Sequence, residues 1–229
     1  MKTNRGEQSF VNLPAFAAQL YDSLMQSSAT KMQYQEIARD LVTRIESGRL
    51  LDIGTGPGHL LREVHKFDPE IELYGLDISS AMVERAGRNL SGIKVDLQCG
   101  SIRATNYQTG HIDLVTCSGS FYLWDKPTDC LNEIHRILKP GKAAHLYETH
   151  REMDKQLLWK NMRMNLKGEN LIRKVLAPRF LIKQIGMTYS RNEIASIIEK
   201  TAFAGNYEIE GITIVNLPIW VRVRLEKSA

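Results

Sequence analysis

No stretch of this chain approaches the roughly 18 to 20 consecutive apolar residues that a membrane-spanning helix requires. The opening residues also lack the apolar segment of a signal peptide, so we expect a cytoplasmic protein without a membrane span. Cysteine is scarce: Cys99, Cys117 and Cys130 are odd in number, follow no CxxC spacing and lie among apolar residues. We therefore expect buried free thiols, no disulfide and no metal site.

Charge of one sign is in only small excess, because 30 Lys and Arg residues face 26 Asp and Glu residues, a net charge of +4. Such a balance does not by itself indicate a nucleic-acid-binding protein. With 43% hydrophobic and 24% charged residues, the composition excludes disordered, collagen-like and disulfide-scaffold proteins. A length of 229 residues suits a single domain.

The basic residues are concentrated between residues 151 and 187, where nine Lys and Arg residues face three Asp and Glu residues. This segment has a helical pattern over residues 154–166, including Trp159, Met162 and Met164, and is interrupted at Gly168 and Pro178. We interpret it as an insertion that caps the domain. Two interpretations of its charge stay open: a solvated helical face whose lysines cover apolar surface, or a surface that attracts an anionic substrate.

The rest of the chain alternates between helical and strand-like hydrophobic patterns. Helices are predicted at residues 14–25, 31–45, 59–67, 79–90 and 125–138, and strands at residues 49–54, 71–78, 93–100, 111–119 and 142–149. A capping box at Ser190 and Glu193 starts a further helix, and two strands at residues 206–215 and 219–227 read as an antiparallel hairpin. The pattern predicts an α/β fold, a doubly wound, mostly parallel sheet ending in that hairpin.

Several residues mark where these helices begin and end. We expect Ser79 or Ser80 and Asp125 as N-caps, Gly48 and Gly205 as stops, Pro140-Gly141 as the end of the helix that starts near Pro127, and an Asn-Leu-Pro connection in the hairpin. The domain then divides into N-terminal helices (1–46), a core (47–150), the cap insertion (151–187) and a C-terminal helix and hairpin (188–229).

A glycine-rich turn, LDIGTGPG at residues 51–58, joins the first predicted strand to a helix. Glycines there allow positive φ and the close approach of a ligand to the backbone. Asp77 closes the next strand, where a carboxylate can accept hydrogen bonds from both hydroxyls of a ribose. The two features together favour a nucleotide-like ligand.

The form of the turn narrows the ligand. The nicotinamide-binding pattern is GxGxxG, whereas this chain has GxGxG, Pro57 removes a backbone donor, and Asp52 precedes the turn. A carboxylate at that position would repel a pyrophosphate and suit a ligand with an amino group. These residues disfavour a dehydrogenase.

Three ordered motifs, LDIGTGPG, Asp77 in YGLDIS and EIHRILKPGK, resemble those of the class I S-adenosylmethionine-dependent methyltransferases. The resemblance spans about residues 35 to 150 and is closest to the small-molecule branch that includes the ubiquinone and menaquinone C-methyltransferases. It implies S-adenosylmethionine as cofactor, S-adenosylhomocysteine as product, and a Rossmann-like seven-stranded sheet whose last two strands form a hairpin.

The resemblance also implies a set of cofactor-binding residues. Asp77 would hold the ribose hydroxyls, and Asp52 would orient the turn and reach the methionine amino group through water. The remaining predicted cofactor contacts are Gly54, Thr55, Gly56 and Gly58 in the turn, Ile78 and Met82 beside the adenine, and Ser101, Ile102 and Ser118. Many relatives have Gly-Asp-Ala where this chain has Gly100-Ser101-Ile102, so a serine hydroxyl would replace the usual acid. For Met82, core packing is the alternative, and for Ser118 a small turn residue.

The implied reaction is the in-line attack of a nucleophilic N, O, S or C on the sulfonium methyl group, for which a dedicated base is optional. Candidate catalytic residues are Tyr21, Tyr122 and His150, with Trp124 beside them. The alternatives are helix-core packing for Tyr21 and a surface position for His150.

The leading hypothesis is therefore a methyltransferase for a small metabolite, and an anionic metabolite corresponds to one of the two interpretations of the basic segment. An RNA methyltransferase and a non-catalytic S-adenosylmethionine-binding protein remain the alternatives. DNA methylation is disfavoured, because the fourth strand is followed by CSGSFYLW and not by the Asn/Asp-Pro-Pro-aromatic or Pro-Cys elements of DNA methyltransferases. A monomer and a homodimer are both compatible with the sequence.

Overall fold

A seven-stranded sheet with the order β3-β2-β1-β4-β5-β7-β6 organises the molecule. The computed structural model describes residues 14–152, 156, 158, 160, 167, 168 and 171–229. β1 to β5 run parallel, whereas β7 is antiparallel to both β5 and β6. The strands are β1 (Arg49–Ile53), β2 (Glu72–Asp77), β3 (Val95–Cys99), β4 (Ile112–Ser118), β5 (Leu138–Thr149), β6 (Tyr207–Ile214) and β7 (Leu217–Glu226). The predicted α/β sheet with its C-terminal hairpin is confirmed.

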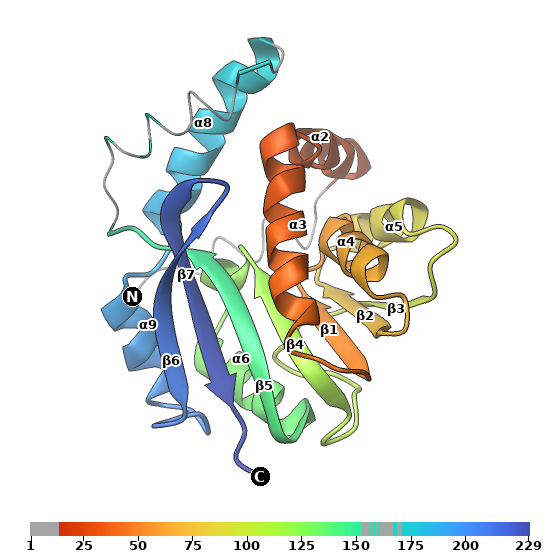
Figure 1. Cartoon of the computed structure of the whole chain (residues 1–229), viewed down its shortest axis with the longest axis vertical. Coiled ribbons are helices and arrows are strands. Elements are labelled where there is room, and N and C mark those ends of the chain that lie inside the picture. Colours follow the sequence, from red (N-terminus) through yellow and green to blue (C-terminus); the bar gives the residue numbers. More distant parts are fainter. Residues whose placement is uncertain (1–13, 153–155, 157, 159, 161–166, 169–170) are drawn as a thin grey trace.

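Helices cover both faces of the sheet (Figure 1). They are α2 (Ala15–Met25), α3 (Ser28–Val42), α4 (His59–Phe67), α5 (Ser80–Asn89), α6 (Pro127–Ile137), α8 (Leu171–Met187) and α9 (Arg191–Ile198), with a short 3-10 helix, η1 (Phe121–Leu123). One hydrophobic cluster joins α3, α4 and α5 to the sheet, and a second joins α6 and α9 to the opposite face.

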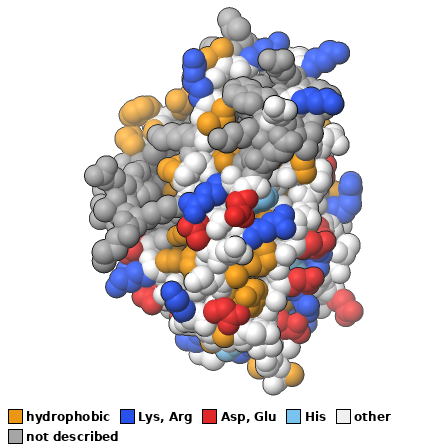
Figure 2. Space-filling view, turned by 90° about the vertical axis from the view of Figure 1, so that its left-hand side faces the viewer, with side chains coloured by type: hydrophobic (Ala, Val, Ile, Leu, Met, Phe, Trp, Pro, Cys, Tyr) orange, Lys and Arg blue, Asp and Glu red, His pale blue; other side chains and the backbone are white. Residues whose placement is uncertain are grey.

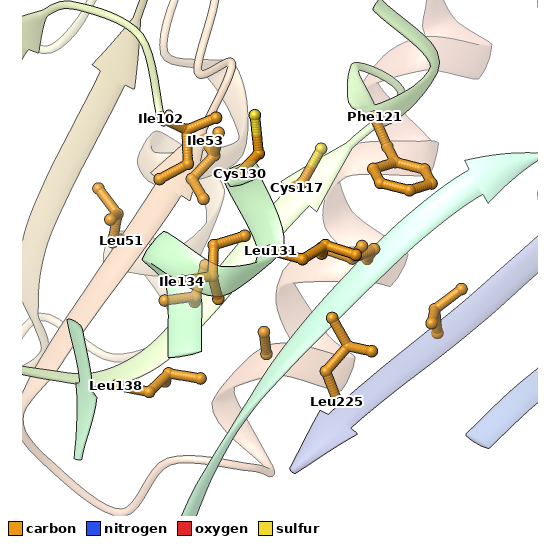
Figure 3. Close-up of a cluster of buried hydrophobic side chains, with 14 of the residues drawn as sticks. Leu51, Ile53, Ile102, Cys117, Phe121, Cys130, Leu131, Ile134, Leu138 and Leu225 are labelled. Atoms are coloured by element: carbon orange, nitrogen blue, oxygen red, sulfur yellow. The ribbon is translucent and has the colours of Figure 1, made fainter. Parts of the chain in front are cut away.

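The α6 side of the core shows how the sheet is sealed (Figure 3). Cys130, Leu131 and Ile134 of α6 pack against Leu51 and Ile53 of β1, and all five side chains are buried. A strand that is buried on both faces needs apolar side chains on both, which explains the apolar run in the sequence of β1. Burial of β1 therefore fixes the point at which the chain emerges into the glycine-rich turn.

The order of strands places that turn at a crossover point. β1 pairs with β2 on one side and with β4 on the other, so the chain leaves β1 between two diverging connections. In open α/β sheets, ligands bind in the crevice outside the carboxyl ends of the strands at such a point. A ligand-binding site is therefore expected at the carboxyl ends of β1, β2 and β4.

The beginning and end of α6 differ from the prediction. Lys126, with φ 48° and ψ 65°, is the N-cap residue, and the Asp125 carboxylate accepts a hydrogen bond from Arg103 instead. The helix ends at Ile137, and Pro140-Gly141 lie within β5. The Gly141 amide donates to the carbonyl of Lys227, the residue after β7. A proline forces the residue before it into an extended conformation, so the helix ends earlier than its apolar pattern suggests.

Other predicted boundaries also move. α3 ends at Val42, ahead of Gly48, and α9 ends at Ile198, ahead of Gly205; both glycines adopt positive φ in the turns that follow. The hairpin turn is Val215-Asn216, both with positive φ, because a two-residue turn of this kind matches the twist of the strands. The predicted Asn-Leu-Pro connection is therefore one residue late. The Ser79 N-cap and the Ser190–Glu193 capping box are confirmed.

The cap insertion is described in part. The predicted helix at residues 154–166, with Trp159, Met162 and Met164, lies largely outside the described residues. The predicted interruption at Pro178 is wrong, since α8 continues through this proline from Leu171 to Met187. Within the described ranges, no helix is long and apolar enough to cross a membrane, and no group of three or more acidic, His or Cys side chains is arranged to hold a metal ion.

The three cysteines are free, but they are not all buried. Cys117 and Cys130 lie in the core, whereas Cys99 is exposed. Cys99 is the last residue of β3, which is the edge strand of the sheet. The prediction that all three thiols are buried is wrong for Cys99.

Candidate active site

A pocket opens at the carboxyl ends of β1, β2 and β4, as the strand order suggests. Its walls include twelve residues predicted from the sequence: Tyr21, Asp52, Gly54, Thr55, Gly56, Asp77, Ile78, Met82, Ser101, Ile102, Ser118 and Tyr122. They come from α2, from β1 and the glycine-rich turn after it, from the end of β2 and the start of α5, from the loop after β3, from the end of β4 and from η1. Segments more than one hundred residues apart in the chain thus meet in one cavity.

The glycine-rich turn exposes backbone to this pocket. Gly54 and Gly56 have φ of 69° and 52°, a region that side chains rarely allow. A Cβ atom on Gly54 would lie 2.3 Å from the Ser120 hydroxyl, whereas a Cβ on Gly56 would meet nothing within 4 Å. Gly54 is therefore required by the protein's own packing, and Gly56 leaves open space beside the pocket wall.

Asp77 links β2 to that turn. Its Oδ2 accepts a hydrogen bond from the Gly56 amide at 2.8 Å, and its Oδ1 accepts one from the Ser79 amide at 2.9 Å. Burial raises the pKa of Asp77, although the two amide donors oppose this shift. Each carboxylate oxygen can accept a second hydrogen bond, so Asp77 can hold the turn and still receive two hydroxyl groups from a ligand.

Asp52 is the second carboxyl group of the pocket. It lies at the buried end of β1, and no cationic side chain of the described residues pairs with it. Burial, reinforced by the charge of Asp77, raises the pKa of Asp52 to about 7. A buried carboxyl group without a cation is a favourable partner for a ligand's ammonium group.

Three tyrosines also line the pocket. Tyr21 of α2 and Tyr122 of η1 were predicted, and Tyr34 of α3 was not. Burial raises the pKa of Tyr21 to about 12 and raises the pKa values of Tyr34 and Tyr122 further still. These phenols stay neutral at physiological pH, so they offer hydrogen bonds and aromatic surface and do not act as bases.

Sequence reasoning also missed wall residues that lie in turns, in α4, β2 and η1, and in α8 of the cap insertion. These are Gly119, Ser120, Leu123 and Gln184, together with Pro57, Leu60, Leu76 and Gly100. Gln184 is the described α8 residue in the pocket wall, and its Nε2 lies 3.5 Å from the position of a Cβ on Gly119. No periodicity or motif marks a glutamine in a basic helix, so only the fold could reveal it.

Two predicted residues lie outside the pocket. His150 is buried after β5, where its amide donates to the Ile219 carbonyl, and it is not part of the pocket wall. The pairing of the chain with β7 continues through this residue, so the structure lends no support to a catalytic His150, which stays a prediction. Gly58 is the N-cap of α4 with φ 81°, and a Cβ there would lie 2.8 Å from Leu90, so its role is in packing.

The pocket suits S-adenosylmethionine in three respects. Asp77 can take ribose hydroxyls, Asp52 lacks a cation, and the buried Ser118 hydroxyl has no hydrogen-bond partner among the described residues. An unpaired buried polar atom in a pocket wall indicates that a ligand or water completes its hydrogen bonds. The residues present therefore fit this cofactor.

Comparison with known proteins identifies the domain. Residues 50–141 match the family model described as a methyltransferase domain. An uncharacterised methyltransferase of Bacillus subtilis is 32% identical over 113 residues, which cover 49% of this chain and 61% of that protein. A ubiquinone/menaquinone biosynthesis C-methyltransferase of Desulfotalea psychrophila is 29% identical over 132 residues, covering 56% of this chain and 53% of that protein. The matches span between half and two thirds of these relatives.

Solved structures share the fold over nearly the whole chain. The structure of a plantazolicin methyltransferase in complex with S-adenosylhomocysteine superimposes with a TM-score of 0.68 and covers 99% of this chain and 95% of that one, at 15% identity. At this identity the likeness shows the fold. Residues 50–141 thus match a methyltransferase domain, and the chain has the fold of solved S-adenosylmethionine-dependent methyltransferases.

Proposed function

We propose that the protein transfers a methyl group from S-adenosylmethionine to a small, anionic acceptor. The observation that supports it best is that Asp52 and Asp77 both line the pocket at the glycine-rich turn. Tyrosines of α2, α3 and η1 line the same pocket. When bound, S-adenosylmethionine supplies an electrophilic sulfonium methyl group. The chain's own residues then have to bind, orient and shield the reacting groups.

The cofactor side of the pocket is assigned from its hydrogen-bonding groups. Asp77 holds the ribose hydroxyls while it fixes Gly56, and Asp52 attracts the methionine ammonium group. Ser101 and Ile102, after β3, lie where the adenine edge and face would rest. Met82, which is buried at the start of α5, supplies apolar contact there. The core-packing interpretation of Met82 holds as well, since one side chain does both.

The acceptor side is assigned to Tyr21, Tyr122, Trp124 and Gln184, which face the pocket from α2, η1 and α8. None of these groups is a base at neutral pH. Catalysis in this site therefore comes from holding the nucleophile in line with the methyl group and excluding water, which can be worth several orders of magnitude in rate. The Gln184 amide can donate and accept, so it is suited to orienting an acceptor's polar group.

The charge of the cap insertion supports an anionic acceptor. Lys160, Lys167, Lys174 and Arg179 are exposed in the described part of this segment. Figure 2 shows Lys and Arg side chains at the end of the molecule where α8 projects. A cluster of one sign beside a pocket raises the local concentration of ions of the opposite sign and accelerates their association.

Isothermal titration with S-adenosylmethionine and S-adenosylhomocysteine tests the cofactor. We expect dissociation constants in the micromolar range, about −8 kcal/mol, for the wild type. A folded protein that gives no heat with either compound would contradict the proposal.

Transfer of a radiolabelled methyl group to a panel of small molecules tests the proposed class of methyl acceptor. Matched pairs with and without a carboxylate or phosphate group should show a preference for the anion that weakens with salt. Transfer to RNA, with binding that falls steeply as salt rises, would favour the RNA alternative. Cofactor binding with no transfer to any acceptor would favour the non-catalytic alternative.

A further inference from the structure

Helix α2 carries Tyr21 to the pocket wall, yet its described side chains make little buried apolar contact with the domain. Among its described side chains, only Ala18 and Asp22 are buried, while Phe16 and Leu20 are 73% and 56% exposed. None of its described residues belongs to either hydrophobic cluster of the described core. A surface helix normally docks through an apolar stripe, so another interaction has to hold this one.

A buried carboxylate provides that interaction. Asp22 has no exposed surface. Its Oδ1 lies 2.6 Å from the His59 Nε2 of α4, and its Oδ2 accepts from the Arg85 Nε of α5 at 2.6 Å. Asn89, also on α5, donates to Oδ1 at 3.3 Å. Charge-assisted hydrogen bonds of this length are among the strongest that side chains make.

The partners of Asp22 are held in turn. Arg62 donates to the His59 Nδ1 at 3.0 Å, so the neutral His59 ring donates from Nε2 to Asp22. Asn89 also donates to the Pro57 carbonyl at 2.9 Å. Pro57 lies in the glycine-rich turn, and α4 begins at His59 directly after that turn. The network therefore joins α2 to the backbone that surrounds the cofactor pocket.

We propose that Asp22 is the positioning residue that holds Tyr21 over the pocket. Tyr21 is its immediate neighbour in α2, and the small Ala18 is the one buried apolar side chain among the described side chains of the helix. Asp22 acts through Tyr21 and through the position of the helix, and it does not line the pocket itself. This inference rests on the proposed cofactor site.

The test compares two aspartates whose carboxylates both accept hydrogen bonds from arginine side chains. Asp22→Asn offers one acceptor oxygen where two are used, so either the His59 or the Arg85 donor loses its partner. Asp40→Asn is the matched control, because Asp40 of α3 also accepts from two cationic side chains, Arg44 and Arg222, and is not in the pocket wall. We expect S-adenosylhomocysteine to bind about tenfold more weakly to Asp22→Asn, as measured by titration calorimetry, and within about twofold of wild type to Asp40→Asn.

A double-mutant cycle with Tyr21→Ala tests the route of the effect. If Asp22 acts through Tyr21, Asp22→Asn in the Tyr21→Ala background weakens binding by less than about twofold. Equal losses in both backgrounds, or no loss in the wild-type background, would overturn the proposal.

Hydrogen exchange gives a readout that needs no ligand. Amides of α2 should exchange faster in Asp22→Asn than in wild type, with those of α6 unchanged. Unaltered exchange in α2 would refute the anchoring role of Asp22. A wild-type protein that fails to bind S-adenosylhomocysteine would instead count against the cofactor site, and the exchange result would still decide whether Asp22 anchors the helix.

Discussion

The Asp77 carboxylate at the end of β2 accepts a hydrogen bond from the Gly56 amide at 2.8 Å, across a separation of 21 residues in the chain. This contact ties the second strand to the turn after the first. Asp77→Asn keeps the size of the side chain but loses one acceptor and the charge. We expect S-adenosylhomocysteine to bind about ten- to a hundredfold more weakly, as measured by titration calorimetry.

Asp96→Asn is the matched control for that measurement. Asp96 lies on the neighbouring strand β3, is exposed and does not line the pocket. Its substitution should leave affinity within about twofold of wild type, as exposed surface changes usually have small effects. Equal losses in the two variants would show that Asp77 has no special role.

The affinity for S-adenosylhomocysteine should depend on pH through Asp52. Burial raises the pKa of Asp52 to about 7, so this carboxyl group is protonated at pH 6 and ionised at pH 8. The ionised form attracts the ligand's ammonium group, so affinity should rise about tenfold from pH 6 to pH 8. Titrations with Asp52→Asn should lose this rise; a profile that matches wild type would exclude Asp52 as its source.

The same carboxyl group should affect stability in the opposite direction. The pKa of Asp52 is higher in the folded protein than in the unfolded chain, where it is about 4. Its contribution to stability is therefore present below pH 4 and is lost as pH rises to about 7. In thermal unfolding without ligand, Asp52→Asn should gain stability relative to wild type as pH increases from 4 to 8. A constant difference across that range would contradict this account.

Two glycines of one turn should respond differently to alanine. Gly56→Ala and Gly58→Ala both place a side chain at positive φ, which costs about 1–2 kcal/mol of stability. The added methyl group at Gly58 also meets Leu90 at 2.8 Å, whereas at Gly56 it meets only open space beside the pocket. Gly58→Ala should therefore have the lower unfolding temperature, and Gly56→Ala the larger loss of cofactor affinity. The reverse order in calorimetry would contradict the assignment.

Glu148 should lower the stability of the folded protein at alkaline pH. Its Oε1 accepts from the Phe121 amide at 2.7 Å, its Oε2 has no partner among the described residues, and burial raises its pKa to about 8. Because the folded pKa lies above the unfolded one, the stability that Glu148 contributes is lost as pH rises from about 4.5 to 8. Glu148→Gln keeps the acceptor for the Phe121 amide but does not ionise. The unfolding temperature of this variant should therefore rise relative to that of the wild type as pH increases. The exposed Glu70→Gln should show no such gain.

The sequence by itself determined the alternation of strands and helices, the hairpin, and the chemistry of the glycine-rich turn. These features depend on short-range patterns: apolar runs, capping residues, and glycines at positions where the backbone adopts positive φ. For the same reason the sequence could predict that Asp52 and Asp77 lie in the pocket wall, because each sits at the end of a recognisable strand.

Tertiary structure decided everything that depends on which segments meet. Gln184 and Tyr34 enter the pocket because α8 and α3 pack beside it, and His150 leaves it because β7 pairs through that residue. Asp22 looks like any polar residue of a surface helix until α4 and α5 bring His59 and Arg85 to it. A local pattern carries no information about partners 37 or 63 residues away, since these contacts arise only when the sheet orders its helices in space.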